Sequence, residues 1–270
     1  EDAELAVRAL KKQRLANQLH RVADGAEALE FLQGSEQLPK LVLHDLKLPK
    51  IDGLEVLRAL KGDPRTQSMP IVLLIRHGET EWNRSGRVMG DQPIPLNRTG
   101  EEQARTCAGI LSRTPIAAIY TSPVLRAAQT AEILRGPQEI PLHQVPGLSE
   151  IGVGNWINRY WHEFADDPAK REWYTHPDRA RPSGGETLRE VQQRAVAAVE
   201  QALAPAHDSP VVIVSHGDVI RAILAHYLQL DLAIIRQARI DHVAVSGLDL
   251  TGTAAQLLFL NHRPGLETLL

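Results

Sequence analysis

Two histidines follow apolar segments that have the length of buried strands. Residues 71–75 run directly into Arg76 and His77, and residues 211–214 end two residues before His216. Because parallel strands deliver the side chains at their carboxyl ends to one crevice, we expect both histidines to face the same pocket. A neutral imidazole is a competent nucleophile near pH 7, and a guanidinium binds phosphoryl oxygens through a planar fork. This combination predicts a phosphate pocket.

Five sequence blocks occur in an order and spacing similar to those of the histidine phosphatase (phosphoglycerate mutase-like) superfamily. They begin with Arg-His-Gly-Glu-Thr, end with Ser-His-Gly and occupy residues 76–83, 95–104, 120–131, 182–187 and 215–217. The resemblance covers essentially all of residues 71–270. It implies a phosphatase domain that removes phosphoryl groups from small molecules through a phosphohistidine on His77.

Four side chains are candidates for binding the phosphoryl group. Arg76 and Arg126 offer bidentate hydrogen bonds that keep their charge, and Asn83 can donate a neutral hydrogen bond. His216, when protonated beside the phosphate, would add positive charge where negative charge develops. We expect all four to bind substrate, and Arg76, Arg126 and His216 to act in catalysis as well.

The leaving alkoxide needs a proton, and Glu150 is the candidate acid. It occupies the position at which phosphatase members of the resembled family carry theirs, and repulsion from a phosphate dianion would raise its pKa. In a second step the same carboxylate can activate water. We expect no metal or other cofactor, because the arginines and His216 neutralise the charge. Glu186 is expected to cap or brace the helix that follows it.

The segments that carry these residues alternate between strand-like and helix-like patterns. The predicted helices have apolar residues three and four positions apart, whereas the predicted strands are short apolar runs. This alternation predicts an α/β three-layer sandwich with a mostly parallel sheet. The predicted strands are 71–75, 116–120, 141–145, 211–214 and an edge hairpin of 242–250 and 255–261 bridged by residues 251–253, and the predicted helices are 100–111, 123–134 and 187–203.

Residues 1–70 resemble part of a response-regulator receiver domain. The resemblance is carried by residues 24–29, 43–53 and 63–66, and the family assigns Asp45 the role of phosphoryl acceptor. A first strand ending in an acidic pair, a hydroxyl residue after the fourth strand and a lysine after the fifth have no counterpart. We therefore expect two parts, an incomplete receiver-like segment at 1–70 and a phosphatase domain at 71–270, with Asp45 an unreactive surface carboxylate.

Composition excludes several other classes of protein. A formal net charge of −3 argues against nucleic-acid binding, and no apolar run approaches the ~18 residues that cross a bilayer. The chain contains one cysteine and no visible signal peptide, which favours a cytoplasmic location. The expected partner is therefore a small-molecule phosphate ester, and the sequence leaves oligomeric state open.

Two other functions compete with phosphomonoester hydrolysis. A phosphoglycerate mutase would use the same phosphohistidine, but the residues around Glu150 lack the Asn-Glu-Arg-His-Tyr-Gly-like acid loop of that group. A two-component signalling protein would regulate the phosphatase through Asp45, and the missing receiver parts argue against it. The substrate stays open among sugar phosphates, phosphoglycerates, nucleotide-pathway phosphates and a cobalamin-precursor phosphate.

Overall fold

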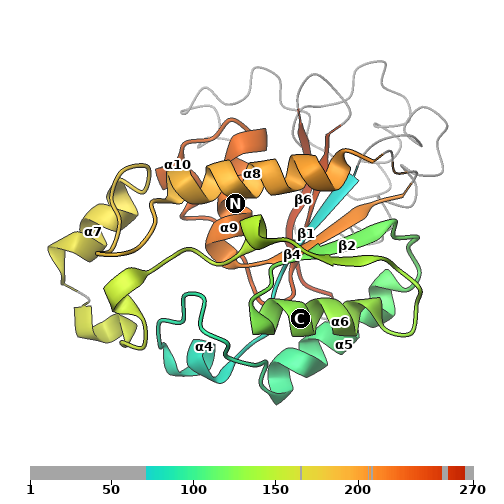
Figure 1. Ribbon diagram of the computed structural model, residues 1–270, viewed down its shortest axis with the longest axis horizontal. Coiled ribbons are helices and arrows are strands. Elements are labelled where there is room, and N and C mark those ends of the chain that lie inside the picture. The colour runs from blue at the N-terminus through green and yellow to red at the C-terminus, as the bar shows by residue number, and fades with distance from the viewer. Residues whose placement is uncertain (1–70, 165, 206, 208, 251–254, 265–270) are drawn as a thin grey trace, which may run out of the picture.

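The computed structural model describes residues 71–264 except 165, 206, 208 and 251–254 (Figure 1). The predictions for residues 1–70, including Asp45, and for the turn at 251–253 lie outside the described residues.

The centre of the described chain is a six-stranded sheet in the order β3-β2-β4-β1-β5-β6. Strands β3, β2, β4 and β1 run parallel to one another, and β5 is antiparallel to both β1 and β6. This confirms the mostly parallel sheet and the antiparallel pair at its edge. The strands are β1 (Ile71–Arg76), β2 (Ala118–Thr121), β3 (Leu142–Gln144), β4 (Val211–Ser215), β5 (Val245–Asp249) and β6 (Gln256–His262).

Helices cover both faces of this sheet, which confirms the predicted three-layer sandwich (Figure 1). Alternate residues of β1 point to opposite faces, so Val72 and Leu74 join the core under α8 and α9, whereas Leu73 and Ile75 join the core with α5 and α6. The helices are α4 (Glu81–Ser85), α5 (Arg98–Leu111), α6 (Leu125–Arg135), α7 (Pro168–Thr175), α8 (Leu188–Leu203), α9 (Gly217–Tyr227) and α10 (Leu232–Ile235).

Of the two roles expected for Glu186 at the start of α8, capping belongs to another residue. Thr187 is the N-cap, and its hydroxyl accepts a hydrogen bond from the backbone of Glu190, whose carboxylate accepts one in return from the backbone of Thr187. This reciprocal pair satisfies the first free N–H groups of the helix. Glu186 therefore does not cap α8, and its carboxylate instead braces the helix through an ion pair with Arg194. Among the described residues, no helix is long and apolar enough to cross a membrane.

Candidate active site

His77 lies at the carboxyl end of β1, where that strand meets β4. Its backbone N–H donates to the carbonyl of Ser215 (2.9 Å), and the residue is 1% exposed. The ring Nδ1 lies 2.7 Å from the carbonyl oxygen of Gly78. Because a carbonyl can only accept, Nδ1 carries the proton and Nε2 presents a lone pair. The local fold thus fixes the tautomer that a nucleophile attacking through Nε2 requires.

The turn after His77 is held by close backbone packing. A Cβ atom at Gly78 would lie 2.5 Å from the carbonyl oxygen of Gly100, and one at Gly100 would lie 2.1 Å from that of Glu79. Only glycines permit this approach between the turn and the first residues of α5. The Gly78 N–H donates to the hydroxyl of Thr130 (3.0 Å), which anchors the turn to α6.

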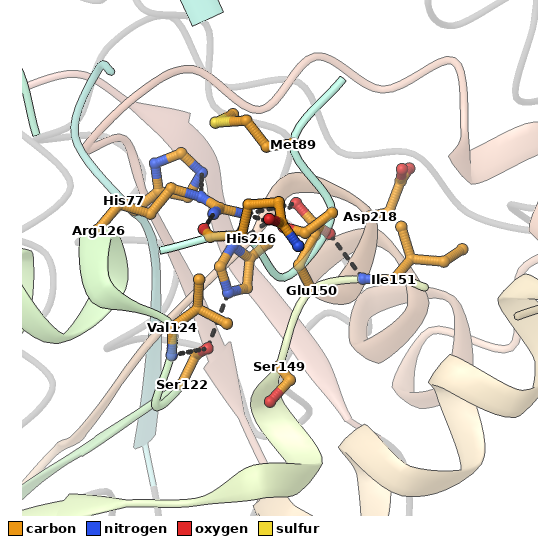
Figure 2. A network of polar contacts seen from close by, with 12 residues as sticks. His77, Met89, Ser122, Val124, Arg126, Ser149, Glu150, Ile151, His216 and Asp218 are labelled. Carbon is orange, nitrogen blue, oxygen red and sulfur yellow. Dashed lines mark hydrogen bonds and ion pairs between the residues drawn. The ribbon is translucent and has the colours of Figure 1, made fainter. Parts of the chain in front are cut away.

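Arg126 lies in the first turn of α6, and its guanidinium is the centre of the site (Figure 2). The side chain is fully buried, and its Nε donates to Nε2 of His77 (3.1 Å). Its Nη1 and Nη2 donate to the carbonyls of Gln92 (3.2 Å) and Gly90 (2.8 Å). A cation in this position can donate hydrogen bonds to the oxygens of a phosphoryl group that is attached to Nε2 of His77.

His216 is the N-cap residue of α9, directly after β4, and its ring centroid lies 5.2 Å from that of His77. Its Nδ1 lies 3.2 Å from Nη2 of Arg126, and its Nε2 lies 2.8 Å from the hydroxyl of Ser122. Since a guanidinium only donates, Nδ1 accepts and Nε2 carries the proton. As the parallel-strand argument predicted, the two histidines face each other.

Glu150 lies in a loop, and its carboxylate is next to the guanidinium of Arg126. Its Oε1 accepts from the N–H of Ile151 (2.9 Å), and its Oε2 lies 3.6 Å from Nη2 of Arg126 and 3.5 Å from Nδ1 of His216. The carboxylate side chain is 16% exposed. Burial raises the pKa of Glu150 above its ordinary value, although the charge of Arg126 opposes this effect.

A clamp built on Arg194 of α8 positions the loop that carries Glu150. The Arg194 side chain donates to the carbonyls of Gly147 (2.9 Å), Ser149 (2.7 Å) and Glu150 (3.1 Å). Its Nε and Nη2 also bind the two carboxylate oxygens of Glu186, each at 2.9 Å. Arg194 was not among the predicted site residues, because its only local signal is a cation flanking the apolar stripe of α8.

Arg76 and Asn83 have different surroundings. Nη1 of Arg76 donates to the carbonyl of Ile240 (2.7 Å), and burial lowers its pKa to about 10, which leaves it charged at neutral pH. The Asn83 side-chain oxygen accepts from the N–H (3.1 Å) and hydroxyl (2.9 Å) of Thr80 in the capping box of α4. The side-chain oxygen of Asn83 is thus used in helix capping, and donation by its NH2 group to a substrate stays a prediction, whereas Arg76 lies among the site residues.

The free site holds its imidazoles neutral. Burial, followed by the charge of Arg126, lowers the pKa of His77 and of His216 well below the ordinary value. Neutrality is what the nucleophile needs. For His216, however, the positive charge expected from the sequence would arise only when a phosphate dianion enters and offsets the arginines.

The site also contains donor atoms of the kind that bind metals. One ligand atom from each of His77, Glu150 and His216 lies within 4.8 Å of the other two. Two histidines and a carboxylate would suit zinc in spacing. However, the guanidinium of Arg126 contacts all three of these side chains, and a cation beside it would be repelled. The charges of the site therefore favour an anion.

Two family models match the chain. The model for the histidine phosphatase superfamily (branch 1) matches residues 72–263, and the model for the response regulator receiver domain matches residues 1–90. The matches overlap at residues 72–90, a segment that begins within β1.

Several known proteins are similar to the chain over this region. Adenosylcobalamin/alpha-ribazole phosphatase of Salmonella typhimurium is 30% identical over 192 residues, which cover 70% of this chain and 95% of that protein. Metal-independent phosphoserine phosphatase of Arabidopsis thaliana is 34% identical over 58% of this chain and 68% of its own length. A probable phosphoglycerate mutase of Serratia proteamaculans is 30% identical over 66% and 84%. The structure of a mycobacterial glucosyl-3-phosphoglycerate phosphatase in complex with VO3 superposes with a TM-score of 0.67 at 27% identity, over 72% and 99% of the two chains.

Proposed function

Because the chain belongs to the histidine phosphatase superfamily, we propose that it hydrolyses small-molecule phosphomonoesters by way of a phosphohistidine on Nε2 of His77. The observation that carries this proposal is the arrangement of the Nε2 lone pair. It faces the Nε of Arg126 at 3.1 Å, and the buried carboxyl group of Glu150 lies beside the same guanidinium. Nucleophile, anion ligand and acid thus meet at one point.

In the first step, Nε2 of His77 attacks phosphorus and the ester P–O bond breaks. The departing alkoxide takes the proton of Glu150, and burial favours the protonated form of this carboxyl group by raising its pKa. The Nδ1–H of His77 keeps its hydrogen bond to the carbonyl of Gly78, which stabilises the positive charge that the ring acquires.

In the second step, water attacks the phosphoryl group on the opposite side from His77. The carboxylate of Glu150 accepts the proton of that water, the P–N bond breaks and its electron pair returns to Nε2. Phosphate then leaves, and Glu150 is protonated again for the next turnover. One carboxyl group therefore serves as acid and then as base.

Arg126, Arg76 and His216 stabilise the phosphoryl charge during both steps. The hydrogen bond from Nε of Arg126 to Nε2 of His77 occupies the lone pair that must attack, so substrate oxygens have to replace this contact. The exchange gives the arginine a dianion in place of a neutral acceptor, which is the stronger, charge-assisted interaction. Binding therefore releases the nucleophile.

We propose that the reaction needs no metal ion, since guanidinium groups provide the required charge. The name of the Arabidopsis relative, a metal-independent phosphoserine phosphatase, supports this view. Hydrolysis is also better supported than mutase transfer, because phosphatases predominate among the similar proteins named above. The pairing of β1 with β4 and β5 supports a domain boundary near residue 70.

An assay of p-nitrophenyl phosphate hydrolysis in the presence of EDTA tests the proposal. The wild-type chain should turn over with chelator present, and His77→Asn should lose about 10³-fold or more in kcat because no phosphoryl acceptor remains. Replacement of the exposed His226 by Asn provides the matched control. Retained hydrolysis in His77→Asn would refute the proposed mechanism.

A further inference from the structure

A third imidazole lies beside the nucleophile. The ring centroid of His242 is 5.9 Å from that of His77, and the residue belongs to the turn that precedes β5. The next residue, Val243, donates its N–H to the carbonyl of Arg76 (2.9 Å), so the turn is tied to the end of β1. His242 is therefore held next to the nucleophile by backbone contacts.

Two buried nitrogens in this corner of the site lack partners. Within the described part of the chain, Nε2 of His242 and Nε of Arg76 are buried and make no hydrogen bond. Buried polar atoms in native proteins almost always have partners, and exceptions call for an explanation such as an absent ligand. Arg76 directly precedes His77, and its carbonyl accepts the N–H of the residue after His242, so the three residues lie in one corner of the site.

The backbone beside His242 is strained. Val243 has a φ of 54°, in the left-handed region that β-branched residues avoid. Such strain persists only where the surrounding structure imposes it, and it concentrates at ligand-binding positions. Here the strained residue immediately follows the imidazole that has no partner. The strain therefore indicates that the surrounding structure holds this turn, and His242 with it, in a fixed conformation beside the site.

His242 is uncharged in the free protein. Burial, followed by the charge of Arg76, lowers its pKa to about 3, so the ring carries a single N–H at neutral pH. A neutral imidazole can offer that N–H to an anion, as Asn or Gln would with an amide. The nearby carboxylate of Asp241 is occupied by the side chains of Arg239 and Asn261 and is not its partner.

We propose that His242 is a substrate-binding residue whose Nε2–H, together with the Nε–H of Arg76, donates to oxygens of the phosphoryl group presented to His77. This inference rests on the proposed function and adds to it a neutral donor that faces the phosphoryl oxygens. The bound anion then supplies the partner that both nitrogens lack in the free protein.

The affinity of the full chain for orthovanadate tests this role. His242→Leu should weaken vanadate binding by about tenfold, the typical value of one hydrogen bond, and should lower kcat/KM to a similar extent. His242→Asn retains a neutral donor and should recover part of the affinity, whereas the exposed His226→Leu should bind as the wild type does. Wild-type affinity in His242→Leu would overturn the proposal.

A spectroscopic measurement on the unaltered chain keeps the test independent of variant folding. The ¹⁵N resonance of His242 Nε2 should shift when vanadate is added, and an unchanged resonance would overturn the proposal. The proposed phosphohistidine mechanism is tested separately, because retained activity in His77→Asn would refute it. A chain in which His77→Asn is inactive and His242→Leu binds vanadate normally would refute only the inference about His242.

Discussion

At the scale of single residues, the site works by placing ionisable groups where burial and the charge of Arg126 decide their protonation. The imidazoles of His77 and His216 are kept neutral, whereas burial raises the pKa of Glu150. Burial therefore keeps the nucleophile neutral and moves the pKa of the acid in the direction that proton donation requires.

Glu150 acts in both chemical steps, and its loss should affect them unequally. With p-nitrophenyl phosphate the departing phenolate needs little acid assistance, so Glu150→Gln should still form the phosphohistidine. Hydrolysis of that intermediate lacks its base and should slow by about 10² to 10³-fold. Stopped-flow measurement should then show a burst of p-nitrophenol close to one per site, followed by a slow phase. A linear trace at the slow rate would exclude this division of roles.

The buried imidazoles should also make stability depend on pH. His242 has a pKa of about 3 when folded, against about 6.5 when unfolded, so below about pH 6.5 only the unfolded chain takes up its proton. The free energy of unfolding should therefore decrease as the pH is lowered, and His242 should account for about 2 kcal/mol of that decrease at pH 5. Urea titrations at pH 7 and pH 5 should show His242→Asn losing less stability than the wild type and than His226→Asn. Equal losses in all three would contradict the buried, neutral state of His242.

At the scale of elements, strands β1 and β4 deliver the histidines, and α8 controls the acid. The sequence predicted the first part, because apolar runs ending at Arg76 and Ser215 are local signals. The sequence did not predict the residues that hold the site in position, among them Ser122, Thr130 and Arg194. Their roles depend on contacts across long sequence separations, such as that between Arg194 and Gly147, and no local pattern encodes such contacts.

The clamp formed by Arg194 gives a prediction at this scale. Arg194→Met removes the donors that hold the carbonyls of Gly147, Ser149 and Glu150 while preserving length, so the acid should lose its orientation. We expect kcat to fall about tenfold or more with a smaller change in KM, because misplacement of an acid affects the transition state. Arg189→Met on the same helix, at an exposed position, is the control. Equal kinetics for the two variants would show that the clamp does not position Glu150.

At the scale of the whole molecule, β1 is an interior strand of the sheet that the described residues form. β1 pairs with β4 on one side and β5 on the other, so both of its edges are occupied within the phosphatase fold. The α/β sandwich and its mostly parallel sheet could be predicted from the alternation of elements. The placement of Asn83 in a capping box could not, because a motif position does not reveal which partner a side chain selects.

The receiver-like segment should not control the reaction, since the hydroxyl residue and the lysine that receiver chemistry uses after the fourth and fifth strands have no counterpart in the sequence. Asp45→Asn in the full chain should therefore leave kcat and KM for p-nitrophenyl phosphate unchanged within about twofold, with or without acetyl phosphate. A change in turnover on adding acetyl phosphate that disappears in Asp45→Asn would show that the segment is a working switch.

The most direct measurement is the chemical identity of the phosphorylated residue during turnover. The Glu150→Gln chain is mixed with a ³²P-labelled phosphomonoester, quenched in alkali within milliseconds and mapped by peptide mass spectrometry. The label should be stable in alkali, labile in acid and attached to His77. It should be absent from the double variant that carries both Glu150→Gln and His77→Asn. Alkali-stable label on a residue other than His77, or turnover with no labelled protein, would contradict the account.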